Sequence, residues 1–240
     1  MKSFFFPPRN LRDELLDLDE ASYEEVRDSL RDVKVVNRYL SGYRVLLHHI
    51  KKLLKRHRGD RPFTVLDAAT GSADQPVALA KVARTMDIPI RIIAIDINAK
   101  MLKMAKEETS EYPEIHLVQS DILNLPFKDE EFDLAINNLS LHHFSWNNAI
   151  AIIRAIYKSS RLGFLINDLH RSRIAYIAIF LLTRIFTRNR LTRYDAPVSV
   201  MNAFTPSEFR DLARQAEIET FEIHCHFPYR IVFLGQKNDK

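Results

Sequence analysis

The feature that most constrains the fold of this 240-residue chain is an alternation of strand-like and helix-like segments between Phe63 and Asp168. The strand-like segments are short apolar runs at residues 63–69, 90–95, 115–118, 132–137 and 162–166. Helical patterns lie between them at residues 74–86, 98–109 and 145–158. Strands that alternate with helices of this length form right-handed βαβ units, and continuous apolar runs are typical of parallel strands covered on both faces. The alternation therefore predicts an α/β fold built on a doubly wound parallel sheet.

The segments on either side of this alternation complete the predicted fold. Residues 206–216 are predicted to form a helix with a capping box, because Thr205 precedes the helix and Glu208 follows three residues later. Residues 219–226 and 229–235 have the pattern of a hairpin at the sheet edge, which makes a seven-stranded, mostly parallel sheet. The first 58 residues are predicted to be helical. We therefore expect an N-terminal helical cap at 1–58 and one main domain at 59–240.

Charge and cysteine content narrow the class of protein. Lys and Arg number 35 against 31 Asp and Glu, a balance that does not indicate a nucleic-acid partner. The one cysteine, Cys225, allows no intrachain disulfide, so we expect a cytoplasmic protein. The three-Phe run that Pro7 and Pro8 end is too short for a signal peptide. The longest apolar run, residues 174–186, contains Arg184 and is shorter than the roughly 20 residues that a membrane-spanning helix needs.

Small and acidic residues gather where the predicted strands end. In doubly wound sheets, ligands bind outside the carboxyl ends of the strands. The first strand leads into the turn VLDAATGSADQP, where Gly71 lets the backbone approach a ligand closely. Asp96 ends the second strand, and a carboxylate there can accept hydrogen bonds from both ribose hydroxyls. Asp121 follows the third strand, where it can accept from an adenine amino group, and Asn137-Asn138 ends the fourth.

Taken in order, these strand ends resemble the class I S-adenosylmethionine (SAM)-dependent methyltransferase family, and within it the small-molecule members related to ubiquinone and menaquinone methyltransferases. The resemblance rests on VLDAATGSAD, IIAIDIN with KML, QSDILNLPF and FDLAINNLSLHHF. It implies a Rossmann-like fold in which residues 59–240 bind SAM as the cofactor. The SAM-binding residues that it implies, from the methionine part through the ribose and adenine to the sulfonium, are Asp67, Ala69, Gly71, Asp74, Asp96, Ile97, Met101, Asp121, Ile122 and Asn138. Ala69 and Ala73 stand where many members have glycine.

A dinucleotide such as NAD is the competing cofactor, because a strand, a turn and a helix followed by an acid also suit it. NAD needs its pyrophosphate at the helix N-terminus, where free amides and the positive end of the helix dipole lie. Asp74 would repel that phosphate, and it occupies the position of the third glycine in G-x-G-x-x-G. SAM has no phosphate and carries an ammonium group, which an acid near this turn favours. The residues therefore favour SAM.

Three histidines after predicted strands are the candidate catalytic residues. His142 and His143 follow the fourth strand, and His170 follows the fifth. A phenolic acceptor, with a pKa of about 10 by analogy with Tyr, benefits from a general base, which is most often His. We expect one of the three to act as the base or to orient the acceptor, with Asp168 orienting the histidine. Each can instead serve only the structure of its strand end. No metal ligands are predicted.

The most individual segment is a helical, lid-like insertion at residues 170–204. It contains the apolar run 174–186 with arginines at both ends. A helix that is apolar nearly all round is either buried or in contact with something hydrophobic. Three interpretations stay open: packing in the core, a lid over a hydrophobic acceptor, and peripheral membrane contact through residues 171–193. The pieces NDLHRS, RNRL, DAP and AFTP also resemble a bacterial subgroup found with polyketide-type pathways.

The leading hypothesis is methyl transfer to a hydroxyl of a small hydrophobic acceptor that is phenolic, quinone-like or polyketide-like. The alternative is C-methylation of a quinone ring, which needs less of a base. Nucleic-acid methylation is disfavoured, because Asn137-Asn138-Leu139-Ser140 follows the fourth strand in place of an NPPY-type tetrapeptide. A non-catalytic SAM-binding protein is a further hypothesis. The oligomeric state stays open.

Overall fold

A computed structural model describes residues 6–18, 20–39, 42–57 and 61–237. In this part of the chain seven strands form one sheet in the order β3-β2-β1-β4-β5-β7-β6. The strands are β1 (Phe63–Ala68), β2 (Ile90–Asp96), β3 (Ile115–Gln119), β4 (Phe132–Asn138), β5 (Ser160–Leu169), β6 (Thr220–His226) and β7 (Arg230–Gln236). The first five are parallel, and β7 runs antiparallel to both β5 and β6. The predicted doubly wound sheet with a C-terminal hairpin is confirmed.

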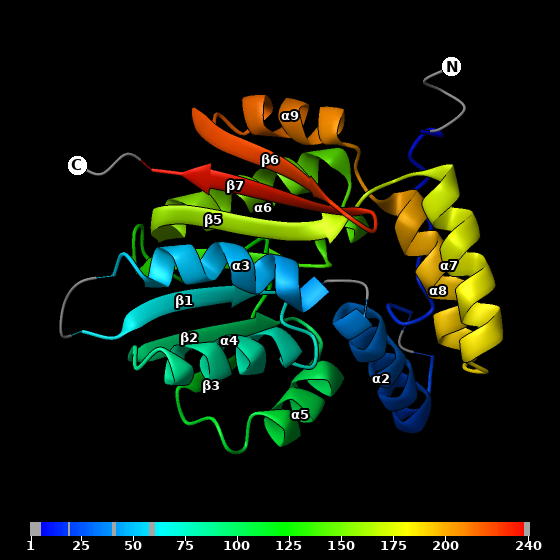
Figure 1. Cartoon of the computed structure of the whole chain (residues 1–240), viewed down its shortest axis with the longest axis horizontal. Helices are drawn as coiled ribbons and strands as arrows, with labels where there is room; N and C mark the ends of the chain where they lie inside the picture. The colour runs from blue at the N-terminus through cyan, green and yellow to red at the C-terminus, as the bar shows by residue number, and fades with distance from the viewer. Residues whose placement is uncertain (1–5, 19, 40–41, 58–60, 238–240) are drawn as a thin grey trace.

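Helices cover both faces of the sheet (Figure 1). The helices are α2 (Tyr23–Tyr39), α3 (Gly42–Leu54), α4 (Asp74–Thr85), α5 (Ala99–Glu108), α6 (Trp146–Ser159), α7 (Arg173–Phe186), α8 (Arg190–Asn202) and α9 (Pro206–Gln215), with a short 3₁₀ helix η1 (Leu141–His143) after β4. Helices α3, α4 and α5 lie on one face, and α6 and α9 lie on the other. Helices α2, α7 and α8 lie beyond the carboxyl ends of the parallel strands, where ligands bind in such folds.

Local sequence explains where the covering helices begin. The Asn98 side chain accepts hydrogen bonds from the backbone N–H groups of Lys100 and Met101, and this caps α5. The predicted capping box of α9 is present, because the Thr205 hydroxyl accepts from the Glu208 N–H and the Glu208 carboxylate accepts from the Thr205 N–H. These caps satisfy N–H groups that have no partner within the helix, so each helix starts at a defined residue.

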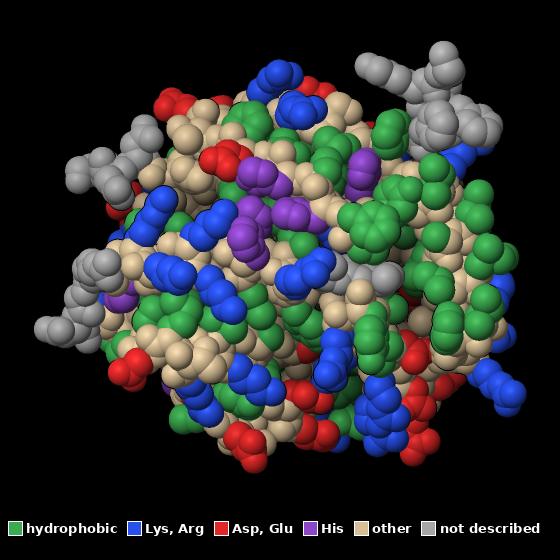
Figure 2. Space-filling model, in the orientation of Figure 1, with side chains coloured by type: hydrophobic (Ala, Val, Ile, Leu, Met, Phe, Trp, Pro, Cys, Tyr) green, Lys and Arg blue, Asp and Glu red, His purple; other side chains and the backbone are tan. Residues whose placement is uncertain are grey.

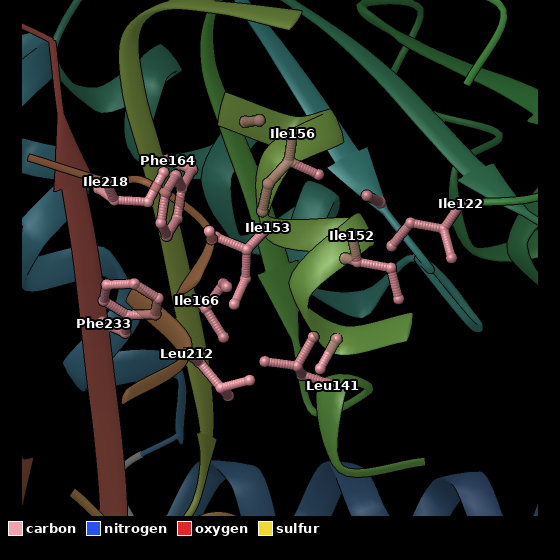
Figure 3. Packing of buried hydrophobic residues seen from close by; sticks show 14 of the residues in the cluster. Ile122, Leu141, Ile152, Ile153, Ile156, Phe164, Ile166, Leu212, Ile218 and Phe233 are labelled. Atoms are coloured by element: carbon pink, nitrogen blue, oxygen red, sulfur yellow. The ribbon is translucent and has the colours of Figure 1, made fainter. Parts of the chain in front are cut away.

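The core divides into two apolar layers, one on each face of the sheet. The layer shown in Figure 3 brings together side chains of α6, β5, β7 and α9, namely Ile152, Ile153, Ile156, Phe164, Ile166, Phe233 and Leu212. The opposite layer packs α3 and α4 against the other side of the sheet, around Leu46, Ile50 and Leu79. Burial on both faces explains why the parallel strands have continuous apolar sequences.

A pair of glycines allows β5 and β7 to lie side by side. A Cβ at Gly163, which has a φ of +124°, would overlap the carbonyl oxygen of Gly235, and a Cβ at Gly235 would overlap the ring of Phe164. Phe164 and Gly235 are direct partners in the antiparallel register. Only residues without a side chain fit here, and this fixes how the C-terminal hairpin joins the parallel strands.

The N-terminal part differs from the helical cap that we expected over residues 1–58. Residues 6–18 contain no helix; they follow an extended path with a turn near Leu15. Helix α3 belongs to the layer that covers the sheet, since Leu46 and Ile50 pack into that core. The prediction of helix throughout was wrong for residues 6–18, because backbone N–H groups there are bonded to side chains of α8, and the bond from the N–H of Asp17 to the carbonyl oxygen of Glu14 forms a turn that does not continue as a helix. The N–H groups of Leu15 and Leu16, for example, donate to the two carboxylate oxygens of Asp195.

Helix α7 presents its large apolar side chains to solvent. Its exposed apolar residues are Ile174, Tyr176, Ile177, Leu181, Leu182, Ile185 and Phe186. The two buried residues in this helix are Ala175 and Thr183. Core packing, one of the three interpretations of this segment, is therefore wrong for the exposed face. Among the residues that the structure describes, no helix is long and apolar enough to cross a membrane.

Candidate functional site

The turn between β1 and α4 has a backbone that leaves open space beside it. Ala69, Gly71 and Ala73 have φ values of 63°, 56° and 59°, in the left-handed region that glycine adopts most readily. A Cβ built on Gly71 would meet no atom of the described residues within 4 Å. The two alanines thus take the glycine-like conformation although they have a side chain. The turn keeps the shape expected for close approach of a ligand.

Asp96 joins this turn to the end of β2. Its Oδ2 accepts a hydrogen bond from the N–H of Gly71 at 2.8 Å, and its Oδ1 accepts from the N–H of Asn98 at 2.9 Å. The neighbouring Ile97 is exposed. The structure places Met101, another predicted cofactor residue, in a buried cluster between α5, α2 and α8. Asp96 and Ile97 are thus at the open edge of the site, whereas Met101 packs inside the protein.

Three carboxyl groups at this edge have raised pKa values. Burial raises the pKa of Asp67 to about 7, and the nearby carboxylates of Asp74 and Asp96 add to the effect. Burial also raises the pKa values of Asp74 and Asp96. One oxygen of Asp67, Oδ2, has no hydrogen-bond partner among the described residues, and Asp74 Oδ2 accepts from the Tyr43 hydroxyl at 2.5 Å. Carboxyl groups are thus concentrated at this edge, where the charge of Lys34 acts on Asp74 in the opposite direction to burial.

The ends of β3 and β4 supply the other predicted cofactor residues. Asp121 turns the chain after β3 by accepting from the N–H of Leu123 at 2.9 Å, and the neighbouring Ile122 is buried in the core. Asn138 ends β4, and its Oδ1 accepts from the side-chain amide of Asn167 on β5 at 2.6 Å. The strand order places β3, β2, β1 and β4 side by side. The carboxyl ends of these strands therefore form one continuous edge.

The arrangement fits SAM better than a phosphate-bearing cofactor. SAM is cationic at its ammonium and sulfonium groups, and buried carboxyl groups with raised pKa values are stabilised in their ionised form by a nearby cation. Asp67 would gain a favourable charge partner, and Asp96 would face the hydroxyls of the ribose. A phosphate placed beside Asp67 and Asp74 would instead be repelled. The open space at Gly71 leaves room for the ligand next to the backbone.

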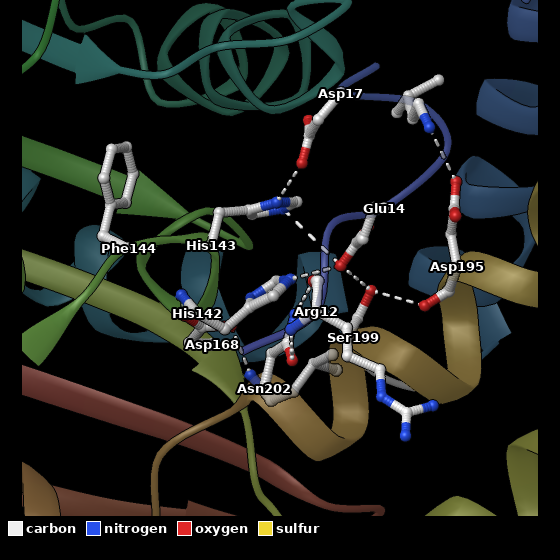
Figure 4. A network of polar contacts seen from close by, with 12 residues as sticks. Arg12, Glu14, Asp17, His142, His143, Phe144, Asp168, Asp195, Ser199 and Asn202 are labelled. Atoms are coloured by element: carbon white, nitrogen blue, oxygen red, sulfur yellow. Dashed lines mark hydrogen bonds and ion pairs between the residues drawn. The ribbon is translucent and has the colours of Figure 1, made fainter. Parts of the chain in front are cut away.

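His142 lies buried between two carboxylates (Figure 4). Its Nδ1 is 2.6 Å from Asp168 Oδ1, its backbone N–H donates to Asp168 Oδ2 at 3.0 Å, and its Nε2 is 3.6 Å from Glu14 Oε1. Burial alone would lower the pKa of His142, but Asp168 and Glu14 outweigh it and raise the pKa to about 10. In this arrangement His142 is an imidazolium at neutral pH and lacks the free lone pair that a general base needs.

His143 and His170 have different surroundings. His143 is partly exposed; its Nδ1 lies 2.8 Å from Asp17 Oδ2 and its Nε2 lies 3.9 Å from Glu14 Oε1. His170 stacks on Phe6 with ring centroids 5.5 Å apart, and its buried Nε2 has no hydrogen-bond partner in the described part of the chain. Burial and the nearby Arg171 lower the pKa of His170. His170 is therefore neutral at pH 7, so it could accept a proton.

A pocket of about 530 Å³ lies between residues 7–12, α7 and α8. Its lining is mainly apolar and includes Tyr176, Ile177, Phe180, Pro197, Val198 and Met201. Four arginines (Arg12, Arg173, Arg184 and Arg193) and two asparagines (Asn10 and Asn202) contribute polar groups. Small-molecule sites of this kind usually measure about 300–1,000 Å³ and combine apolar walls with a few polar groups. Helices α7 and α8 thus form walls of a pocket of the size of a small organic molecule.

Several residues of this region were not predicted from the sequence. Glu14 and Asp17, which contact the two adjacent histidines, come from residues 6–18, and Tyr43, which bonds Asp74, comes from α3. None of them lies in a motif or at a strand end. No local signal could have identified them, because each is brought to the site by the packing of its segment.

Part of this chain is similar to known methyltransferases. Residues 65–163 match the model of a methyltransferase domain. A demethylmenaquinone methyltransferase of Staphylococcus carnosus is 35% identical over 83 residues, which are 35% of this chain and 33% of that protein. A 2-phytyl-1,4-naphtoquinone methyltransferase of Trichormus variabilis is 31% identical over 97 residues, 39% of this chain and 41% of that protein. The matches thus span less than half the length of these curated relatives.

Solved structures share the fold at low sequence identity. A SAM-dependent methyltransferase from Aquifex aeolicus is 16% identical, with a TM-score of 0.54, and the match covers 77% of this chain and 87% of that one. The sheet order and the acidic strand ends fit the fold and the domain that these matches indicate. The chain therefore carries, over residues 65–163, a class I SAM-dependent methyltransferase domain related to those of the quinone methyltransferases.

Proposed function

We propose that this chain transfers the methyl group of SAM to a hydroxyl of a small hydrophobic acceptor of the phenolic, quinone-like or polyketide-like class. The observation that carries the proposal is the group of three carboxyl groups with raised pKa values, Asp67, Asp74 and Asp96, which a cationic cofactor complements. SAM supplies an activated methyl group. The protein then has to hold the acceptor in line with it and exclude water, and such orientation contributes roughly 7–11 kcal/mol in favourable cases.

Five of the predicted cofactor residues have side-chain roles in this proposal. Asp96 accepts hydrogen bonds from the ribose, and Asp121 accepts from the adenine amino group. The carboxylates of Asp67 and Asp74 attract the ammonium group. Asn138, at the end of β4, lies on the sulfonium side.

The pocket between residues 7–12, α7 and α8 is the proposed acceptor site. Its aromatic and aliphatic walls suit a flat hydrophobic molecule, and its volume suits a ring system with short substituents. Among the three candidate histidines, His170 is the best candidate for the base, since its Nε2 has no hydrogen-bond partner among the residues that the structure describes and its pKa is lowered. His142, whose ring nitrogens face Asp168 and Glu14, has a positioning role in this proposal and is not the base.

C-methylation of a quinone-type ring is the second candidate. The observation that favours it is the engagement of His142 by carboxylates at both ring nitrogens, which removes one of the expected bases. A ring carbon activated by its own hydroxyl groups depends less on such a base. Relatives named as quinone methyltransferases support this class of acceptor.

Product analysis with a labelled methyl group separates the two reactions. The purified chain is incubated with SAM that carries ¹³C in its methyl group and with a panel of hydroxylated naphthoquinols and phenols. We expect a new methoxyl resonance in the product formed by the unchanged chain. Separately, Asp96→Asn should lower the affinity for SAM by about tenfold or more, because hydrogen bonds to a charged acceptor contribute about 1.5–3 kcal/mol. His224→Gln, on the exposed strand β6, is the matched control. A C-methyl resonance supports the second candidate, and SAM binding that is unchanged in Asp96→Asn contradicts the proposed cofactor site.

We also propose that the exposed face of α7 contacts an anionic lipid surface, from which a hydrophobic acceptor would reach the pocket. Ile185 and Phe186 are 72% and 78% exposed, and Arg184 and Arg188 lie beside them. Figure 2 shows hydrophobic side chains gathered over this helix. Two arginines of the wider segment do not contribute, since Arg171 pairs with Glu208 and Arg190 pairs with Glu25.

Vesicle co-sedimentation tests this contact. We expect binding to vesicles of phosphatidylcholine and phosphatidylglycerol, and a loss of about tenfold in affinity when Ile185→Gln and Phe186→Gln are combined, because burial of a large apolar side chain contributes about 1.5–3 kcal/mol. Tyr39→Gln is the control, since Tyr39 is 76% exposed on α2. Equal binding of the double variant and the control would exclude the α7 contact.

A further inference from the structure

Three side chains from distant parts of the sequence converge beyond the carboxyl end of β4 (Figure 4). Glu14 belongs to residues 6–18, and His142 and His143 lie in η1. Oε1 of Glu14 lies 3.6 Å from Nε2 of His142 and 3.9 Å from Nε2 of His143. One ligand atom from each residue lies within 4.8 Å of the other two. The three groups thus surround a common point.

Each imidazole is oriented by a second carboxylate. His142 Nδ1 is 2.6 Å from Asp168 Oδ1, and His143 Nδ1 is 2.8 Å from Asp17 Oδ2. An ionised carboxylate only accepts hydrogen bonds, so both Nδ1 atoms carry the proton. Both Nε2 atoms are therefore directed toward Glu14. A histidine that binds a metal through one nitrogen almost always donates its other N–H to a carboxylate, a carbonyl or a water in this way.

The spacing suits ligands of one ion better than direct hydrogen bonds. Separations of 3.6 and 3.9 Å between Nε2 and Oε1 exceed the usual hydrogen-bond range. Two ligands bound to Zn²⁺ at about 2.0–2.2 Å in a tetrahedral arrangement lie about 3.3 Å apart. The two separations between Nε2 and Oε1 would each have to shorten by a few tenths of an ångström. Ser199 also donates to Glu14 Oε1 at 2.5 Å, as groups around a ligating carboxylate do.

Charge and burial at this point also suit a cation. Glu14 and His142 are buried, with exposed fractions of 5% and 2%. The carboxylates of Glu14, Asp17 and Asp168 surround the two rings, whose centroids are 4.4 Å apart. A divalent ion at this point would be bound by the Nε2 lone pairs of both rings and by Glu14 Oε1, and the surrounding carboxylates would balance its charge.

We propose that Glu14, His142 and His143 form a binding site for a divalent first-row transition metal ion, with Zn²⁺ as the ion that the donor set fits best. Two imidazoles and one carboxylate are a donor set found in zinc sites, and three protein ligands leave one position open for water or another oxygen ligand. Metal binding does not depend on the proposed methyl transfer.

A second histidine cluster has to be separated from this site in any experiment. His48, His49, His224 and His226 lie together over α3 and β6, where Figure 2 shows the histidines gathered on the surface. His49 Nε2 and His226 Nε2 are 3.3 Å apart. Such a surface cluster can bind added metal ions by itself. The titrations are therefore made in a background that carries His224→Gln and His226→Gln.

The test uses the full chain in this background after treatment with a chelator. Zn²⁺ alone is titrated by calorimetry, and Co²⁺ alone is followed by its visible absorption. We expect one ion per chain. Glu14→Gln and His143→Gln should each lower the affinity for Zn²⁺ by roughly 100-fold, and Asp17→Asn, which changes only the orientation of a ligand, by about tenfold. Absence of binding in the background protein, or affinity that Glu14→Gln and His143→Gln leave unchanged, would overturn the proposal.

A thermal measurement guards against variants that lose their fold. Zn²⁺ should raise the melting temperature of the background protein, because an ion that binds only the folded state stabilises it. It should raise that of Asp17→Asn less, and that of His143→Gln not at all. The proposed site would be wrong if Asp17→Asn and His143→Gln melted at the temperature of the background protein without metal, and Zn²⁺ then raised their melting temperatures as much as it raised that of the background protein. SAM titration of the same metal-free protein tests the cofactor site separately, so failure of one proposal does not mimic failure of the other.

Discussion

Single residues set both the shape and the charge of the turn after β1. Ala69 and Ala73 hold φ values of 63° and 59°, which cost a residue with a Cβ about 1–2 kcal/mol each. The rest of the turn holds them there, since Gly71 N–H is bonded to Asp96. Asp67 is buried directly before this turn, with its pKa raised to about 7. The proposed cofactor site therefore combines a strained backbone with an acid that titrates near neutral pH.

SAM affinity should rise with pH because of Asp67. Below its raised pKa of about 7 the carboxyl is mostly protonated, so ionising it becomes easier as the pH rises from about 6 to about 8. The ionised form attracts the cationic ligand, so binding should release a proton in this range. Calorimetry in two buffers of different ionisation enthalpy measures the number of protons released.

Asp67→Asn is the matched variant, because its amide resembles the protonated acid. The amino group of the ligand titrates in the same way with both proteins, so the difference between the two pH profiles reports Asp67. We expect the variant to lose the part of the slope that is centred near pH 7. Identical profiles for the two proteins would exclude this role.

At the scale of elements, the Asp133 side chain connects three strands near their amino ends, on the side of the sheet away from the site. Its carboxylate accepts from Arg61 at 2.5 and 2.6 Å, from Arg161 of β5 at 2.9 Å and from the N–H of Thr64 in β1 at 2.8 Å. Burial would raise the pKa of Asp133, but Arg61, the Thr64 N–H and Arg161 outweigh it and hold the pKa below its usual range. The carboxylate thus aligns β1, β4 and β5, on which the site is built.

Asp133→Asn should lower the free energy of unfolding by about 1.5–3 kcal/mol at pH 7, the usual contribution of hydrogen bonds to a charged group. Since the folded pKa lies below the unfolded value of about 3.9, the stabilisation is present above that pH and is lost as the pH falls below it. The difference between wild type and variant should therefore shrink at pH 3. Urea unfolding at both pH values measures it.

The control is Asp129→Asn, which removes an exposed ion pair with Lys158. Such pairs contribute little to stability, so this variant should unfold almost as the wild type does. Equal losses for Asp133→Asn and the control at pH 7 would contradict the proposed role of Asp133.

At the scale of the whole molecule, residues 6–18 hold the insertion against the sheet. The Arg9 guanidinium donates to the carbonyl oxygens of Asn202, His142 and Phe144 at 2.5, 2.9 and 2.7 Å. It also lies 3.9 Å above the ring of Phe204. One side chain of the N-terminal segment therefore links the end of α8 to η1, where the candidate histidines lie. Figure 1 shows this segment passing beside α7 and α8.

Arg9→Met should release this segment while the sheet stays folded. The variant keeps an apolar stem but loses the bonds to three carbonyl groups, so local opening of residues 6–18 should become easier by about 2–4 kcal/mol. Hydrogen exchange followed by mass spectrometry measures this as faster exchange in the N-terminal peptide. Arg12→Met is the control, since the Arg12 backbone and not its side chain is bonded to Asn202. Equal exchange in both variants would show that Arg9 does not hold the segment.

The sequence alone determined the sheet, its helices and the acidic strand ends. Apolar runs, capping residues such as Asn98 and Thr205, and the position of Asp96 are local signals, because each reflects a period or a spacing within a few residues. The predicted bounds of β1–β4 and α4 agree with the structure within two residues. The expected helices before Leu18 were wrong, because backbone bonds to Asp195 replace helical ones there.

Only the tertiary structure decided which of these residues meet. Glu14 reaches His142 although 127 residues separate them, and Tyr43 reaches Asp74 from another helix. The exposure of α7 likewise depends on its packing against α8 and not on its own composition. Local patterns encode the period of an element, but contacts between elements depend on how whole surfaces pack. The strand ends that identify a SAM-dependent methyltransferase domain were therefore visible in the sequence, whereas the cluster of Glu14, His142 and His143 was not.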